Sequence, residues 1–450
     1  MGPIKTQNQH NEMKEITDDE ARKAEIAAAA AVTEKPKRER KKKEAAVAEV
    51  LAPPSPTEVV LNAGQVIDAL GLVRKAVGKG PLAILSCVLI KIPSGGASMV
   101  LACTNCDMWA EVWVPIERRA DGRGVAIAVS AAAMAKLLGE VEATEVSFDI
   151  SEKLVIRAGG WRAELCGLLA QDFPPNPMDG GADRMHPLEL ADGVLKKAMG
   201  AVACCVSTDS TRYVLNGVLL EFWGDELARV VATDGRRLAM VDTGRNKLET
   251  LRRIILPTAV VRLLLAALSE GGETANVWVY QKDAPEGGEV PPPYAVSMVT
   301  GLGLRLWAKL IDGAYPDFTR VIPTEEEEPV LLDGKELVEM CGRASALEPE
   351  GVEIRAAGRA VTVLSMVANV GMWEESGEII SADDRMERPF RVRVNPDYVE
   401  VMAVGEQGRL DVGHARNAGP LVWRANLTVA DLGMEYVAVL MPLRSEGGDQ

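Results

Sequence analysis

The stretch Arg229-Val-Val-Ala-Thr-Asp-Gly-Arg-Arg-Leu-Ala-Met-Val241 decides the fold, because two apolar runs flank a tight turn within it. Asp-Gly favours a chain reversal, since Gly adopts the positive φ that the turn needs and Asp caps its own backbone. Just upstream, residues Tyr213–Phe222 have the composition of a further strand. The region therefore predicts an antiparallel hairpin in an all-β or α+β domain.

The pattern around this hairpin recurs on both sides of it. Each copy begins with a stretch whose apolar residues recur at helical spacing, and these stretches are Asn62–Val73, Leu188–Met199 and Asp333–Cys341. A predicted strand follows in each copy, at Ser86–Ile92, Asn216–Phe222 and Glu350–Arg355. A predicted strand and turn come next, at Leu101–Trp109, Val231–Leu238 and Leu364–Val370.

Each copy then contains a strand that runs into a capped helix, at Val129–Leu138, Leu256–Leu265 and Val394–Met402. Ser130, Thr258 and Asn395 are the expected N-caps or near-caps, and Pro257 and Pro396 are expected in the first turn. Further strands are expected at Val146–Ile150, Leu154–Arg157, Ala275–Tyr280 and Leu304–Ala308. Four elements in the same order three times predict a triplicated α+β domain.

Polar breaks place the domain junctions. Asp179–Asp183 and Thr324–Pro329 separate the copies, so we expect domains at 58–183, 184–327 and 328–445, with a short tail at 446–450. Residues 1–57 combine the basic block Lys35–Lys43 with a Pro-rich segment and have few large apolar residues. We expect this extension to be disordered, as a solubilising tail or as a non-specific DNA tether.

Composition limits the function classes. The chain of 450 residues is 47% hydrophobic and 26% charged, with a net charge of −15 that disfavours indiscriminate binding to phosphate backbones. Seven Cys without a regular framework and no secretory signal are typical of a reducing cytoplasm. His10, His186 and His414 are far apart, so a His-based metal or general-base site is poorly supplied.

Four motifs carry a resemblance that covers about residues 58–445: Tyr213–Glu221, Ala232–Ala239, Tyr315–Pro323 and Tyr436–Arg444. In this order they resemble the β subunit of bacterial DNA polymerase III, the sliding clamp. The resemblance implies a DNA-clamp fold of class α+β: three similar domains, each with two helices lining a ring and antiparallel sheets outside. It also implies a head-to-tail homodimer, first domain against third, that encircles duplex DNA as a cytoplasmic, nucleoid-associated processivity factor.

Such a clamp tethers proteins to DNA and catalyses nothing, so the resemblance implies no cofactor, no metal and no membrane partner. Its expected lining is a diffuse set of cations that act on phosphates without reading sequence. The candidates are Arg74, Lys75, Lys79, Lys136, Lys196, Lys197, Arg262, Lys335 and Arg343. The alternative is that they are ordinary solvated side chains. The segment Asn395–Ala403 has no Lys or Arg and should contribute little.

The resemblance also implies a groove between the second and third domains for short motifs of the polymerase III catalytic subunit, of the ATP-driven clamp loader and of other DNA-handling proteins. The matching positions are Leu215, Thr233, Gly235, Arg236, Arg237, Leu238, Pro316, Arg320, Val321, Asn395, Tyr398, Val439, Leu440, Met441, Pro442, Leu443 and Arg444. Apolar walls, an adaptable Met and polar edges suit a peptide ligand. Leu215, Val439 and Leu440 can instead be core residues.

A departure from the family pattern and the cysteines leave alternatives open. Arg236 stands where many relatives have His, which raises the local charge and removes a pH-sensitive group. This motivates a specialised clamp with altered partners as the alternative function. An enzyme is the other alternative: Cys103-x-x-Cys106 has metal or redox spacing, but no second pair accompanies it, and Cys204-Cys205 is expected to be a buried thiol pair.

Overall fold

The computed structural model describes residues 58–120, 122–180, 188–244, 251–271, 273–282, 290–324, 329–380, 386–405, 407–412, 419–429 and 431–443. These residues form two compact units, one of 58–68, 89–99 and 114–170, and the other of the remaining described residues. The N-terminal extension, the three His residues, Arg444 and the C-terminal tail lie outside the described ranges.

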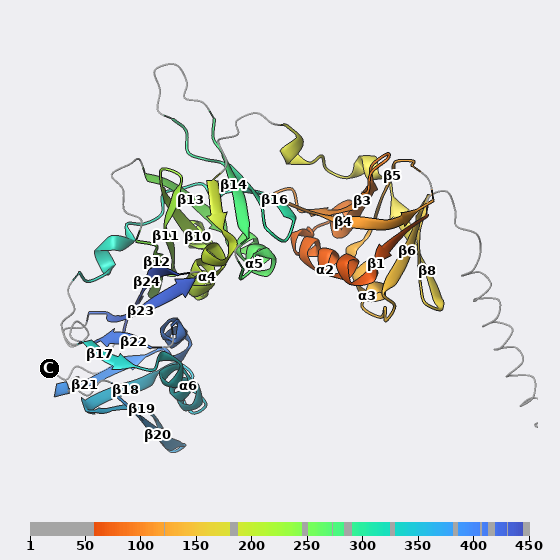
Figure 1. Ribbon diagram of the computed structural model, residues 1–450. Helices are drawn as coiled ribbons and strands as arrows, with labels where there is room; N and C mark the ends of the chain where they lie inside the picture. Colours follow the sequence, from red (N-terminus) through yellow and green to blue (C-terminus); the bar gives the residue numbers. More distant parts are fainter. Residues whose placement is uncertain are drawn as a thin grey trace, which may run out of the picture. The chain divides into compact units, whose positions relative to one another are not determined.

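One order of elements occurs three times, as the sequence predicts (Figure 1). The first copy consists of β1 Glu58–Asn62, α2 Ala63–Val73, β2 Cys87–Ile92, β3 Ser98–Thr104, β4 Met108–Arg119, β5 Val125–Ser130, α3 Ala131–Leu138, β6 Glu145–Ile150, β7 Lys153–Ala158 and β8 Trp161–Leu168. The second consists of β9 Leu188–Ala191, α4 Asp192–Val202, β10 Gly217–Trp223, β11 Glu226–Thr233, β12 Arg237–Asp242, β13 Leu251–Pro257, α5 Thr258–Ala267, β14 Thr274–Tyr280, β15 Ala295–Val299 and β16 Leu304–Lys309.

The third copy consists of β17 Pro329–Leu332, α6 Gly334–Ala344, β18 Val352–Gly358, β19 Ala360–Val367, β20 Gly371–Glu378, β21 Met386–Val394, the 3₁₀ helix η8 Pro396–Ala403, β22 Gly408–Asp411, β23 Leu421–Val429 and β24 Leu432–Leu440. Shorter 3₁₀ turns connect the elements: η1 Arg74–Ala76, η2 Ala83–Ser86, η3 Ala170–Asp172, η4 Pro177–Gly180, η5 Ala203–Cys205, η6 Ser210–Leu215 and η7 Phe318–Val321. The mixture of helices with antiparallel sheets confirms the α+β class.

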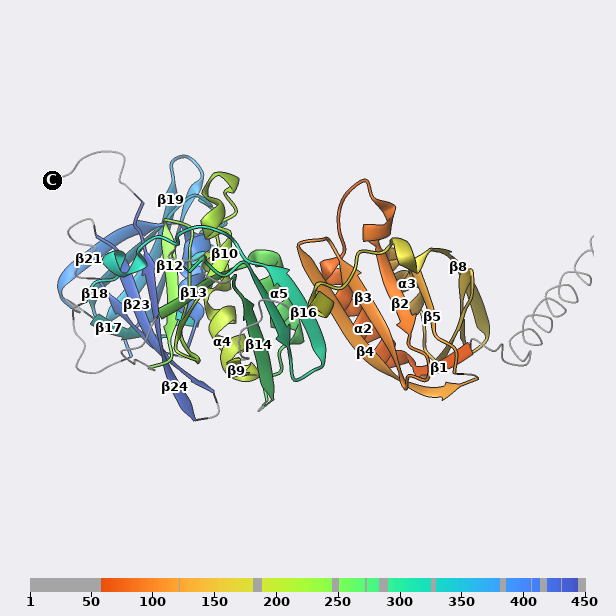
Figure 2. The same ribbon diagram turned by 90° about the horizontal axis from the view of Figure 1, so that it is seen from above.

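The sheets are antiparallel. An eight-stranded sheet has the order β13-β10-β11-β12-β24-β23-β22-β17, so strands of the second and third copies form one sheet (Figure 2). Its joint is β12–β24, whose register runs from Arg237 opposite Leu440 to Asp242 opposite Glu435. A separate four-stranded sheet has the order β20-β19-β18-β21.

The first long helix of each copy has the same length and the same glycine. Helices α2, α4 and α6 each contain 11 residues and follow a short strand. Gly71, Gly200 and Gly342 are the ninth residues of these helices, and all three are exposed. Helix α4 packs beside α5, and α6 packs beside η8. The repeat thus extends to the register of individual residues, which the sequence reading did not detect.

The helix caps follow the predictions in part. Ser130 Oγ accepts from the Ala133 N–H at 3.3 Å, and Asn395 Oδ1 accepts from the Asp397 N–H at 2.9 Å with Pro396 directly after it. Pro257, however, is the N-cap of α5 rather than a first-turn residue. Thr258 Oγ1 does not cap the helix, because it donates to the Asn216 carbonyl oxygen at 2.7 Å.

Three predicted boundaries are wrong for local reasons. Residues Leu188–Ala191 form strand β9 against β14, because their alternate burial has a period of two. Residues Tyr213–Leu215 belong to η6, which Asp209 caps, so the strand begins only at Gly217. The second helix of the third copy, η8, is a 3₁₀ helix.

Candidate functional sites

The turn between β11 and β12 is fixed by its own side chains. Thr233 Oγ1 donates to the Arg237 carbonyl oxygen at 2.7 Å and accepts from the Gly235 N–H at 3.1 Å. Asp234 Oδ1 accepts from the N–H groups of Arg236 at 2.8 Å and Arg237 at 2.9 Å. Gly235 has a φ of +85°, the left-handed value expected from the Asp-Gly signal. The turn therefore presents Arg236 and Arg237 from a rigid backbone.

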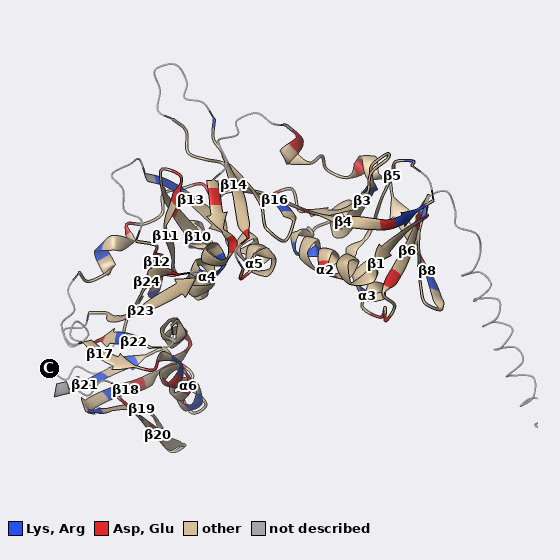
Figure 3. Cartoon of the chain, in the orientation of Figure 1, with Lys and Arg blue, Asp and Glu red and all other residues tan. Residues whose placement is uncertain are grey.

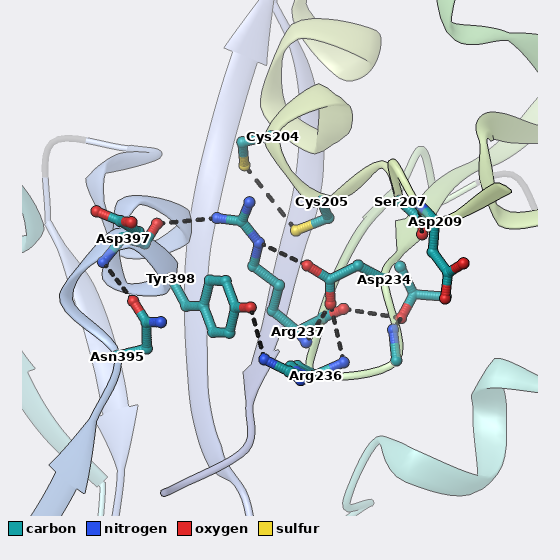
Figure 4. A network of polar contacts seen from close by, with 12 residues as sticks. Cys204, Cys205, Ser207, Asp209, Asp234, Arg236, Arg237, Asn395, Asp397 and Tyr398 are labelled. Atoms are coloured by element: carbon teal, nitrogen blue, oxygen red, sulfur yellow. Dashed lines mark hydrogen bonds and ion pairs between the residues drawn. The ribbon is translucent and has the colours of Figure 1, made fainter. Parts of the chain in front are cut away.

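The third copy completes this site. The Met441 N–H donates to the Arg236 carbonyl oxygen at 2.9 Å, directly after the β12–β24 ladder. Arg237 donates through Nη1 to the Asp397 carbonyl oxygen at 3.0 Å, and its Cζ lies 4.8 Å from the centroid of the Tyr398 ring (Figure 4). Arg236 Nη1 donates to Tyr398 Oη at 3.3 Å. Sequence-distant residues of two copies therefore form one polar network.

Three arginines of this region carry an aspartate three residues earlier. In each pair the arginine Nε lies close to the aspartate Oδ2. The N–O distances are 3.0 Å for Arg212–Asp209, 3.2 Å for Arg237–Asp234 and 2.8 Å for Arg320–Asp317. Arg236 differs, because no carboxylate lies within ion-pairing distance of it among the described residues. Sequence reasoning did not connect these carboxylates with their arginines and missed Arg212, although the spacing Asp-x-x-Arg is visible at each of the three positions.

Two of these aspartates occupy copies of one small motif. Asp209-Ser-Thr-Arg212 begins η6 and Asp317-Phe-Thr-Arg320 begins η7. Hydrogen bonds from Thr211 and, second, the neighbouring Arg212 hold the pKa of Asp209 below its ordinary value. A hydrogen bond from the Thr319 hydroxyl does the same for the pKa of Asp317. Each aspartate caps its turn and orients its arginine at once.

The predicted groove residues divide by exposure. Exposed positions are Gly235, Arg236, Pro316, Arg320, Val321 and Met441. Half-buried positions are Thr233, Arg237, Asn395, Tyr398, Pro442 and Leu443. Buried positions are Leu215, Leu238, Val439 and Leu440. Leu238 and Val439 belong to the core cluster of Leu219, Val231, Ile255 and Phe318, which places them beneath the surface. Burial therefore agrees with the core alternative for Leu215, Val439 and Leu440, and Leu238 is buried as well.

The predicted DNA-facing cations lie at the surface, with two of them paired. Lys196 is half-buried and its Nζ lies 3.3 Å from Glu270 Oε1. Arg343 binds both carboxylate oxygens of Glu375, at 2.9 and 2.8 Å. The exposed others are Arg74, Lys75, Lys79, Lys136, Lys197, Arg262 and Lys335. Arg74 and Lys75 form η1, so they follow α2 rather than belong to it.

Charge on the helices is sparse (Figure 3). In the third copy, Lys335 and Arg343 share α6 with Glu336 and Glu339, and η8 adds Asp397 and Glu400 without a cation. Helix α5 carries Arg262 alone. The helices of the second copy therefore hold more of the unbalanced positive charge than those of the third.

The enzyme alternative depends on the cysteines. Cys103 is buried and Cys106 is exposed with a φ of +72°. Burial raises the pKa of the Cys103 thiol, which opposes a thiolate there. Among the described residues, no group of three or more His, Cys, Asp or Glu side chains is arranged to hold a metal ion. None of the helices in the described ranges combines the length and hydropathy that a membrane span requires.

Comparison with known proteins connects these features to a family. The family model described as DNA polymerase III beta subunit, central domain, matches residues 189–317. A protein of Caulobacter vibrioides named beta sliding clamp is 26% identical over 402 residues, which cover 86% of this chain and all of that protein. The beta sliding clamp of Pseudomonas aeruginosa is 28% identical over 300 residues, covering 65% of this chain and 74% of the relative.

Solved structures show the same fold. A DnaN sliding clamp of Pseudomonas aeruginosa, bound to griselimycin, has a TM-score of 0.71 at 22% identity and covers 87% of this chain and 100% of its own. The DNA polymerase III beta subunit of Thermotoga maritima has a TM-score of 0.71 at 19% identity, over 86% and 99% of the two chains. The relatives and the fold agree with the threefold order of elements, and the family model matches the second copy. The chain is therefore similar in sequence and fold to the β sliding clamps, the β subunits of DNA polymerase III.

Proposed function

We propose that this chain forms a closed, head-to-tail homodimer around duplex DNA and tethers the replicative polymerase and other proteins without a catalytic step of its own. The observation that carries the proposal is the threefold order of elements, with two helices in every copy. A closed ring is retained by topology, so its lining needs only weak contacts to phosphates. The sparse helix charges suit such sliding. We place the protein in the cytoplasm, on the nucleoid.

We propose domains at 58–183, 184–327 and 328–445. Strands β1–β8, β9–β16 and β17–β24 fall within these ranges. The proposed ring closes between copies of the chain by the edges of the first and third domains. This contact is heterologous, and it closes because two subunits complete the circle.

Two open strand edges support that closure. Strand β20 is an edge strand, since among the described residues it pairs with β19 alone, and it carries Glu374, Glu375 and Glu378. Strand β8 pairs with β5 at Gly167 and Leu168, and within the described ranges no other strand lies along that edge. The β7–β8 hairpin contributes Lys153, Arg157 and Arg162, which pair within the chain with Glu164, Glu58 and Glu164 and would have to share these contacts with β20. Pairing β8 of one copy with β20 of another would satisfy both edges and oppose their charges.

Light scattering with the double variant Glu374→Lys/Glu378→Lys tests the interface. We expect the dimer of the unaltered chain to become a monomer at low micromolar concentration. The control Asp225→Lys, which makes one such charge reversal on the exposed β10–β11 turn instead of two on β20, should remain a dimer. A double variant with the dimer mass of the parent would overturn this interface.

The groove of the second and third copies is the proposed partner site, with the exposed positions around Arg236 and Met441 as its surface. Adaptable Met441 and apolar Val321 suit Leu or Phe anchors, while the arginines orient a peptide backbone. The test is a fluorescence-anisotropy titration of a labelled Gln-Leu-x-Leu-Phe peptide against the chain and an Arg320→Ala/Met441→Ala variant. We expect micromolar binding that the variant loses.

A specialised clamp with altered partners is the second candidate, and Arg236, which has no carboxylate partner among the described residues, favours it. In that case the chain forms the dimer but does not bind the ordinary motif. Dimer mass and peptide affinity, measured on the same preparation, distinguish the two. A monomer that binds neither peptide nor DNA would refute both.

A further inference from the structure

Two neighbouring cysteines place their sulfur atoms together beside the partner network. Cys204 and Cys205 lie in η5, directly after α4, and their Sγ atoms are 3.9 Å apart. Successive side chains on a 3₁₀ helix point about 120° apart, so convergence of two adjacent sulfurs requires a specific pair of rotamers. The two thiols form one hydrogen-bonded pair (Figure 4).

The two thiols have different environments. Cys205 is fully buried and Cys204 is half-buried, so one sulfur is reachable and the other lies behind it. A hydrogen bond from Cys205 lowers the pKa of Cys204, and the same bond together with burial raises the pKa of Cys205. The charge of Arg237 favours both thiolates, whereas Glu400 opposes the thiolate of Cys204 and Asp234 that of Cys205.

We propose that Cys204 and Cys205 form a dithiol site for a soft, thiophilic ligand such as trivalent arsenic, and that its occupation disables the partner groove through Arg237. The second half of this inference rests on the proposed function of the groove. The arrangement suits such a ligand because both sulfurs already face one point. The half-buried Cys204 gives the ligand its entry, and the buried Cys205 supplies the second bond.

The reaction balances without an oxidant. Phenylarsine oxide has one arsenic–oxygen group, and two thiols replace its oxygen. Two arsenic–sulfur bonds form, the two S–H protons leave with the oxygen as water, and arsenic remains trivalent. The Cys204 thiolate attacks first, since the thiolate is the nucleophilic form, and Cys205 then closes a ring through arsenic, both sulfurs, both Cβ atoms and the four backbone atoms between them.

Arg237 connects this site to the groove. Its guanidinium acts electrostatically on both thiols and also bonds Asp234 and the Asp397 carbonyl oxygen. Segment η5 packs against β12, which begins with Arg237, and against η8, which carries Tyr398. A phenyl-arsenic group on the sulfurs therefore occupies volume next to Arg237. The contacts of Arg237 to the third copy would be lost together.

Thiol counting tests the site itself. The full chain has seven Cys. After treatment with one equivalent of phenylarsine oxide and unfolding without a reductant, two fewer thiols should be titratable than in the untreated chain. The variant Cys204→Ser should lose this stoichiometric uptake. Cys106→Ser, which breaks the competing Cys103-x-x-Cys106 pair, should take up the arsenical as the parent does. Equal uptake by the parent and Cys204→Ser would overturn the site, as would loss of uptake in Cys106→Ser.

Peptide binding before and after loading tests the coupling. We expect loading with the arsenical to lower the peptide affinity of the parent about tenfold, because the loss of one charged hydrogen bond lowers an affinity by about that factor. A dithiol competitor should restore the affinity, and Cys204→Ser should show no change on treatment. Unchanged affinity of a loaded chain would overturn the coupling. An untreated chain that binds no peptide would refute the proposed groove function, while thiol counting would still decide the dithiol site.

Discussion

Replacing the shared glycines of α2, α4 and α6 by alanine should stabilise the chain. Gly71 and Gly342 have open space where a Cβ would be placed, and the nearest atom to a Cβ on Gly200 is Leu265 Cδ2 at 3.7 Å. Glycine in a helix costs about 0.8–1.0 kcal/mol relative to alanine, because it loses more backbone entropy on folding. Each substitution should therefore raise the free energy of unfolding by nearly that amount.

The three substitutions lie on separate helices, so their effects should add to roughly 2–3 kcal/mol in the triple variant. Urea unfolding followed by circular dichroism measures the change as a shift in midpoint. Gly334→Ala is the matched control in α6, since its Cβ would lie 1.8 Å from the Met402 carbonyl oxygen, and it should destabilise. If Gly342→Ala lowers stability as Gly334→Ala does, the assignment of a free helix surface is refuted.

Three further predictions concern charge. Lys197→Glu with Arg262→Glu should weaken DNA binding and reduce the magnitude of the slope of log K against log salt by roughly 1.8, two phosphate contacts at about 0.9 each; an unchanged slope in DNA titrations would remove both from the lining. Arg236→Ala should remove a preference for peptides with an acidic flank, because this arginine has no carboxylate partner among the described residues; equal affinity ratios of acidic and neutral peptides before and after the change would contradict it. Thr319→Val should raise the pKa of Asp317 towards its ordinary value of 3.8, because it removes the hydroxyl hydrogen bond that lowers this pKa. In the parent, the Asp317–Arg320 contact is lost only as the pH falls through the lowered pKa, so in the variant it should be lost at a higher pH, nearer 3.8; carboxyl NMR titration measures this, and an unmoved pKa would show that Thr319 does not hold it down.

The sequence predicted the threefold architecture because hydrophobic period and turn chemistry repeat in the same order. The prediction failed in short segments whose apolar residues fit both the helical spacing and the strand spacing. Leu188–Ala191 satisfies a helical spacing with the residues after it, yet pairing with β14 makes it a strand. The limits of η6 likewise depend on the cap at Asp209, which propensity alone does not reveal.

The sequence was sufficient to name most residues of the candidate sites, but it did not predict which of them contact one another. The resemblance identified Arg237 and Tyr398, but their 4.8 Å stacking depends on the joining of β12 to β24 across about 200 positions of sequence. The pairing of each arginine with the aspartate three residues earlier was readable, since a 3₁₀ turn brings those side chains to one side. Burial of Val439 and Leu440 could not be read from their apolar character, because a groove wall and a core use the same residue types.

The ladder between β12 and β24 has a mechanical consequence. Its register joins six residues of each strand, so a hinge motion between the second and third copies would have to break several backbone hydrogen bonds together. The β12–β24 pairing is therefore a rigid connection between the second and third copies. Strain applied to the assembled protein, as when a ring is pulled open, would therefore be relieved at joints other than this one. Arg236 and Arg237 would keep their positions while other joints of the assembly open.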